Sequence, residues 1–263
     1  MRGCIYCTSP RLAKPRPVAI FDDTGPTIPS DGTPMTESLN ADLARRALVE
    51  TAKLEWQASP SPTVWRKRLD LFGGEHSRVS SLVRYDANAS FPPHAHPEGE
   101  EILVLDGVFA DEHGEYPAGT YFLNPPGSHH TPRSGPGCVL FVKLCQYTGP
   151  RRDHVVVDTR HAPWTPGPVP GVDAQPLYSQ APYPETMALL RFAAGTALPV
   201  RAYPGGVEIF VLDGAVTDPD GTYARGAWLR LPAGTAFAPR SAKGATIYMK
   251  QGHLPPQGRP TAE

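Results

Sequence analysis

The chain has 263 residues, with 25 basic and 26 acidic side chains and a formal net charge of −1. No basic stripe stands out, which argues against nucleic acid as a partner. No run of about 18 apolar residues and no apolar signal core is present, so we expect no membrane contact and a cytoplasmic location.

Residues 1–40 are rich in proline, serine, threonine and glycine and lack apolar periodicity, so we expect a disordered leader. Cys4 and Cys7 form a CxxC pair that would suit zinc or redox chemistry, but no second pair accompanies it. Met35 opens a stretch typical of a protein start, which predicts that translation begins there.

Residues 38–50, SLNADLARRALVE, carry the one helical pattern of the chain. The same segment has a copy farther along, HVVVD at 154–158, whose β-branched residues favour a strand. The alternative to a helix is therefore an arm that pairs as a strand.

The remainder of the chain consists of two copies of one unit. LVRYDANASFPP at 82–93 matches LLRFAAGTALPV at 189–200 with an offset of 107 residues. Internal repetition of this kind predicts tandem domains. The predicted units are residues 41–150 and 151–252, followed by a polar tail at 253–263.

Each unit contains short apolar runs bounded by glycine, proline, aspartate or asparagine, such as SSLVRY, EILVLDGVFA and GTYFLN. Their lengths suit strands rather than helices, so the predicted fold class is all-β with two sandwiches or barrels. Cys138 and Cys145 flank the run CVLFVKLC, and we expect reduced thiols in or beside the core.

A group of histidines marks the first unit. His94 and His96 are two residues apart, so both lie on one face of a strand. Glu100 begins the next strand, and His129 and His130 follow a tight Pro-Gly turn. Three imidazoles and a carboxylate that converge inside a barrel form a site for a divalent metal.

These residues resemble the cupin superfamily motifs G-x5-H-x-H-x3/4-E-x6-G and G-x5-P-x-G-x2-H-x3-N. The first motif selects Glu100 over Glu101, because six residues separate Glu100 from Gly107. The second motif selects His130 and leaves His129 as a surface residue or as a residue that supports the ligands. The resemblance implies two tandem double-stranded β-helix (jelly-roll) domains. The metal ligands that it implies are His94, His96, Glu100 and His130.

Within the superfamily, residues 45–150 resemble the cupin domain of ChrR-type anti-sigma factors. The resemblance implies one divalent ion per chain, either zinc or iron(II), with manganese and nickel as further candidates. It does not extend to sigma-factor inhibition, because the N-terminal segment lacks the H-x3-C-x2-C zinc motif of those proteins. Two departures from the motifs are Asn88, in place of the leading glycine, and Ser134, in place of the last asparagine.

The second unit is a degenerate copy without metal ligands. At the four ligand positions it carries Arg201, Tyr203, Val207 and Phe237. We expect the last two side chains to fill the space of the metal and the unit to be structural. The alternative is an anion pocket around Arg201 and Tyr203. Glu101 and its copy Glu208 are expected to face outward in a structural role.

Three classes of function are compatible with this pattern. The first is a metal-dependent dioxygenase that acts on a small enolisable or phenolic compound, as in small cupins that cleave β-diketones or hydroxyacetophenones. The second is a ChrR-like metal or ligand sensor without catalysis. An interaction protein built from paired cupins is a third option, and we expect a homodimer that binds a small molecule.

Overall fold

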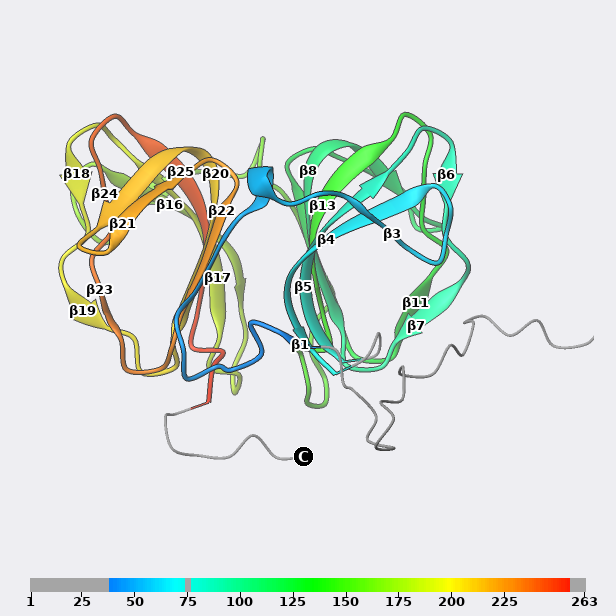
Figure 1. Cartoon of the computed structure of the whole chain (residues 1–263), viewed down its shortest axis with the longest axis horizontal. Coiled ribbons are helices and arrows are strands. Elements are labelled where there is room, and N and C mark those ends of the chain that lie inside the picture. Colours follow the sequence, from blue (N-terminus) through cyan, green and yellow to red (C-terminus); the bar gives the residue numbers. More distant parts are fainter. Residues whose placement is uncertain (1–37, 74–76, 256–263) are drawn as a thin grey trace, which may run out of the picture.

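The computed structural model of the chain describes residues 38–73 and 77–255, which form two β-barrels joined by their larger sheets (Figure 1). Its single helical element is the short 3-10 turn η1 (Thr51–Lys53) between the barrels. No helix in the described ranges is long and apolar enough to cross a membrane. The fold is all-β, as the sequence predicts. Cys4, Cys7 and Met35 lie outside the described residues.

The first barrel has a large sheet in the order β1–β4–β5–β13–β8–β10–β14. The strands of this sheet are β1 (Ser38–Leu39), β4 (Val64–Phe72), β5 (Arg78–Tyr85), β13 (Cys138–Leu144), β8 (Glu100–Ala110), β10 (Thr120–Asn124) and β14 (Val155–Asp158). Shorter strands complete the barrel: β3 (Gln57–Ala58), β6 (Ala89–Ser90), β7 (His94–His96), β9 (Glu115–Pro117), β11 (Ser128–His130) and β12 (Arg133–Ser134).

The second barrel repeats this layout in the order β15–β16–β17–β25–β20–β22–β2. Its large sheet contains β15 (Thr165–Pro166), β16 (Val172–Ser179), β17 (Thr186–Phe192), β25 (Ala245–Gln251), β20 (Val207–Asp218), β22 (Ala227–Leu231) and β2 (Ala47–Glu50). Its shorter strands are β18 (Thr196–Ala197), β19 (Arg201–Ala202), β21 (Gly221–Ala224), β23 (Ala236–Phe237) and β24 (Arg240–Ser241).

The central strands are buried on both faces, which explains their nearly continuous apolar sequence. In β8, Ile102 and Val104 face the core of the first barrel, whereas Leu103 belongs to the cluster between the barrels. Figure 1 shows the resulting layers: the large sheets meet in the middle, and β7 with β11 and β19 with β23 lie at the outer sides. Glu100 therefore faces the barrel interior, and Glu101 faces the other barrel.

The repeated LDG sequence has a backbone cause. Gly107 and Gly214 have φ angles of 71° and 67°, in the left-handed region. A Cβ at Gly107 would lie 2.0 Å from the carbonyl oxygen of Gly137, and one at Gly214 would lie 2.2 Å from that of Gly244. Both barrels thus need glycine at this point. Asn88, the departure from the motif, has the predicted left-handed conformation with a φ of 61°.

The two barrels exchange their first strands. β2 belongs to the first repeat but pairs with β22, so that Leu48 lies opposite Leu229. Its copy β14 pairs with β10, so that Val156 lies opposite Phe122. The strand interpretation of the 38–50 arm is therefore right for residues 47–50, and the helix is wrong. Each barrel is completed by a strand from the other repeat.

Two predicted boundaries need correction. The leader was expected to extend to residue 40, but β1 pairs with the end of β4, and the Asn40 amide donates to the Leu69 carbonyl at 2.7 Å. The polar tail was expected from residue 253, but Leu254 is buried and its backbone N–H donates to Gly205 at 2.8 Å. Hydrogen bonds to the backbone hold both segments in place, although their sequences are polar.

The interface between the barrels holds buried charges. Lys143 Nζ lies 2.5 Å from Glu208 Oε1, and Lys250 Nζ lies 3.4 Å from Glu101 Oε2. Phe141 stacks on the ring of Phe210 beside them. The two glutamates do face away from their own barrels, as expected, but each is only 2% exposed. They form reciprocal ion pairs that join the two repeats.

Candidate metal centre

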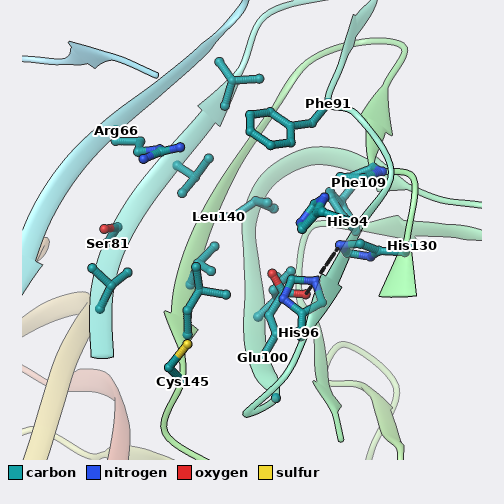
Figure 2. Close-up of a pocket in the computed structure, with 18 of the residues that line it drawn as sticks. Arg66, Ser81, Phe91, His94, His96, Glu100, Phe109, His130, Leu140 and Cys145 are labelled. Atoms are coloured by element: carbon teal, nitrogen blue, oxygen red, sulfur yellow. Dashed lines mark hydrogen bonds and ion pairs between the residues drawn. The ribbon is translucent and has the colours of Figure 1, made fainter. Parts of the chain in front are cut away.

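The side chains of the predicted site come from three strands of the first barrel. β7 and β11 form a two-stranded antiparallel pair in which His130 lies opposite His94. Alternation along β7 puts His94 and His96 on one face, and the turn through Gly99 brings Glu100 to the start of β8. Figure 2 shows all four side chains pointing to one place at the wall of a cavity.

The ligand atoms are close together. His96 Nε2 lies 3.1 Å from His130 Nε2, and Glu100 Oε2 lies 3.3 Å from the first and 3.7 Å from the second. One nitrogen from each of His94, His96 and His130 lies within 4.8 Å of the others, a group that could hold a metal ion. The structure thus brings the four predicted residues together, while His129 is exposed, as predicted.

Hydrogen bonds fix the tautomers of two histidines. The Pro92 carbonyl can only accept, so His94 donates from Nδ1 at 2.9 Å and keeps a lone pair on Nε2. Asp111 Oδ2 lies 3.4 Å from His130 Nδ1, which orients that ring in the same way. A carboxylate or carbonyl on the far nitrogen is the usual support of a metal-binding imidazole.

Burial keeps the imidazoles of His96 and His130 neutral. Desolvation, assisted by the nearby His94, lowers the pKa of His96 to about 3. Desolvation also lowers the pKa of His130, and Glu100 opposes this effect. Neutral imidazole is the form that binds a metal. Both rings therefore remain in their metal-binding form near pH 7.

Asn124 is a member of the site that sequence analysis missed. Its Nδ2 donates to Glu100 Oε2 at 3.1 Å, and it lies opposite Glu100 in the β8–β10 pair. The internal repeat held a signal for it: the copy of Asn124 is Leu231, and the copy of Glu100 is Val207. The polar pair in one barrel is an apolar pair in the other.

A cavity of about 550 Å³ adjoins the four predicted ligands. Most of its wall is apolar, with Phe91, Phe109 and Leu140 among the lining residues. Cys145 also lines it, and both Cys145 and the buried Cys138 are free thiols, as predicted. The site therefore faces a space large enough for a small organic molecule.

The second barrel is filled at the corresponding positions. Tyr203, Val207 and Phe237 are at most 3% exposed and belong to its hydrophobic core. Arg201 is exposed and donates to Gln251 Oε1 at 2.7 Å. The cavity here, lined by Arg201 and Tyr203, is reduced to about 220 Å³.

Solved structures with the same fold share little sequence with this chain. A protein named as a candidate dioxygenase from Nostoc punctiforme aligns with a TM-score of 0.67 and 14% identity, covering 80% of this chain and 84% of its own. Oxalate decarboxylase from Lactobacillus farciminis, in a formate complex, aligns with a TM-score of 0.58 and 10% identity, covering 80% and 87%. A bacterial pirin from Escherichia coli, in complex with nickel(II), aligns with a TM-score of 0.62 and 13% identity, covering 81% and 100%.

Sequence comparison gives a family for both repeats. No curated protein matches the chain. The family model of the ChrR cupin-like domain matches twice, at residues 44–148 and 152–255. The chain therefore belongs to the ChrR cupin-like family, with two copies of the domain in tandem.

Proposed function

We propose that the first barrel binds one divalent metal ion through His94, His96, Glu100 and His130. The donor set supports this proposal. Three imidazoles and one buried carboxylate lie within reach of a common point, and a carboxylate buried without a cation is costly. Imidazole and carboxylate together suit iron(II), zinc, nickel and manganese.

We further propose that the protein is a metal-dependent dioxygenase for a small enolisable or phenolic compound. The observation that carries this proposal is the cavity of about 550 Å³ that opens directly onto the four ligands. A divalent iron ion held there would supply Lewis-acid polarisation of a chelating substrate and electrons for dioxygen. The likeness to a candidate dioxygenase supports the same class.

The chain itself would position the substrate and exclude water. Phe91 packs edge to face on His94 with ring centroids 5.4 Å apart, and Phe109 lies 5.9 Å from His130. These rings bound the space around the ligands with apolar surface. Asn124 and Asp111 hold Glu100 and His130 in their orientations. The reacting part of a substrate would thus contact ligands that are held in fixed orientations and surrounded by apolar side chains.

The family match also favours a second candidate, a sensor module in which metal and ligand binding replace turnover. Metal identity and oxygen uptake separate the two candidates. Iron with oxygen consumption supports the dioxygenase, whereas tightly held zinc without turnover supports the sensor.

The test is elemental analysis of the purified chain, for which we expect about one divalent metal ion per chain. His96→Ala and His130→Ala should each remove most of the metal and lower the melting temperature, because a metal that binds only the native state stabilises it. His129→Ala is the matched control, since this neighbour is exposed. Two metal ions per chain, or unchanged metal in both variants, would contradict the assignment.

Oxygen uptake tests the activity itself. Iron(II)-loaded protein should consume dioxygen when pentane-2,4-dione or a hydroxyacetophenone is added, and His96→Ala should not. No uptake with any member of a β-diketone and phenol panel, from protein that retains its metal, would favour the sensor.

A further inference from the structure

Two arginines face the cavity of the first barrel from the wall across from the histidines. In β4, Val64, Arg66 and Arg68 alternate with residues of the other face, and all three line the cavity. Figure 2 shows the Arg66 side chain extending into the cavity from a strand on the side away from His94 and His130. Arg66 and Arg68 are both half-buried.

The second barrel has neither arginine. Strand register identifies the residue that corresponds to Arg66. Arg66 lies opposite Val83, and Ala174 lies opposite Leu190, which is the copy of Val83. Ala174 is therefore the counterpart of Arg66. In the same way, Arg68 lies opposite Ser81, and its copy Pro176 lies opposite Ala188. The barrel without metal ligands therefore also lacks both guanidinium groups and has the smaller cavity.

The comparison of the two barrels shows whether the fold itself requires these arginines. Positions that the backbone needs, such as Gly107 and Gly214, are the same in both barrels. Arg66 and Arg68 instead differ between the two barrels, as the candidate metal ligands do, so the barrel architecture does not require them.

We propose that the first barrel binds a small organic acid, whose carboxylate pairs with Arg66 and Arg68 while its other end reaches the metal ligands. The inference rests on the proposed function and names the substrate class. Arginine presents a planar fork that matches a carboxylate, and in a partly desolvated cavity such a pair is strong.

The lining sets further limits on this acid. Among the described lining residues, the charged groups besides the histidines are the two arginines and Glu100, and the Arg68 guanidinium also donates to Gln57 Oε1 at 3.4 Å. Aliphatic and aromatic side chains lie between these two ends, including Ile102, Leu140 and Phe91. The expected ligand has one terminal carboxylate on a compact apolar body, rather than several charges.

The experiment compares an acid with its uncharged isostere. The probes are benzoate, phenylacetate and 4-phenylbutyrate, each against its primary amide, measured by calorimetry on the full-length protein, with the metal content of the same sample recorded. At least one acid should bind about tenfold more tightly than its amide, the difference typical of one hydrogen-bonded charged group. If no acid is preferred over its amide, the proposal is wrong.

Variants locate the preference. Arg66→Gln and Arg68→Gln should each reduce the acid-to-amide ratio about tenfold, and Arg66→Lys should restore only part of it. Arg191→Gln, which removes an exposed arginine of the second barrel, is the control and should leave the ratio unchanged. Circular dichroism and metal content show that each variant is folded and loaded as the wild type is. A ratio that survives in both glutamine variants would overturn the assignment.

Two results separate this inference from the metal proposal. If the purified protein holds no metal yet prefers acids through Arg66, the inference stands and the metal proposal fails. If the preference persists in Arg66→Gln and Arg68→Gln but disappears in His96→Ala, the carboxylate binds at the metal and the arginine assignment fails. Inorganic phosphate tests the apolar body: binding as tight as that of the best acid would show a simple oxyanion site and contradict the proposal.

Discussion

The two barrels share a frame and differ in what fills it. Their central strands pair in the same order, and their LDG glycines have φ angles within a few degrees of each other. The interior of the first barrel has a buried His130 beside a cavity of about 550 Å³, whereas Phe237 stands at the same place in the second, with a cavity of about 220 Å³. Backbone and interface requirements persist in both copies, and the candidate metal ligands are confined to one.

The interface explains why the degenerate barrel is needed. Strand exchange makes each barrel depend on the other repeat, because β14 closes the first sheet and β2 closes the second. Lys143 and Glu208, buried and 2.5 Å apart, come from different repeats. The second barrel thus covers a face of the first that would otherwise expose an apolar sheet with unpaired charges.

Truncation at one equivalent position should have very unequal effects on stability in the two barrels. Phe237→Ala should lower the free energy of unfolding by about 3–5 kcal/mol, because it leaves a cavity in a packed core. His130→Ala should lower it far less in chelator-treated protein, since that ring lies beside an existing cavity. Urea titrations of both variants measure the difference. A Phe237→Ala melting temperature within a degree of wild type would mean that the second barrel is open at this place, and would favour the alternative anion pocket.

Acid should act on the second repeat through a histidine that the first repeat lacks. Burial lowers the pKa of His253 to about 4, and the copy of this residue is Gln146. Below pH 6.5 the unfolded chain gains a proton at His253 that the folded chain does not, so acid favours unfolding. The resulting loss approaches about 3 kcal/mol at pH 4.

His253→Gln puts the residue of the first repeat into the second and sharpens this comparison. The free energy of unfolding of the variant should equal that of the wild type near pH 7.5. At pH 4.5 the variant should be the more stable protein. Both proteins carry the same proposed metal site, so any release of metal in acid would affect them alike. Parallel curves of unfolding free energy against pH would show that His253 is not protected from protonation in the folded state.

The frame and the four proposed ligands could be predicted from sequence because both are encoded locally. Strand alternation and the spacing from His94 to Gly107 lie within short segments, and the 107-residue offset is visible because such short segments recur along the chain. The strand exchange could not be predicted, because β2 and β14 are copies of each other and either could pair with β10 or β22. Only the three-dimensional path between the barrels decides that pairing.

The cavity arginines show a second limit. The strand VWRKRLDLF carries charges on both faces, so alternation alone does not reveal which face lines the barrel. Lys67 points away from the cavity and donates to the Thr51 carbonyl at 2.9 Å, whereas Arg66 and Arg68 line it. Asn124 escaped notice for a similar reason: its partner Glu100 is 24 residues away, and only the register of β8 with β10 joins them.

The smallest expected effect comes from Asn124→Leu, which transfers the residue of the second barrel into the first. The Asn124 amide holds Glu100 Oε2 at 3.1 Å, and leucine at this position cannot donate. All four ligands remain, so metal binding should weaken about tenfold rather than disappear, as is usual when a supporting hydrogen bond to a ligand is lost. Competition with a chelator of known affinity measures the change. Leu231→Ala is the matched control at the equivalent position, and it should lower stability without changing the affinity for metal. An Asn124→Leu affinity equal to that of wild type would show that Glu100 is oriented by the turn before β8 alone, and loss of all metal would show that Asn124 itself is a ligand.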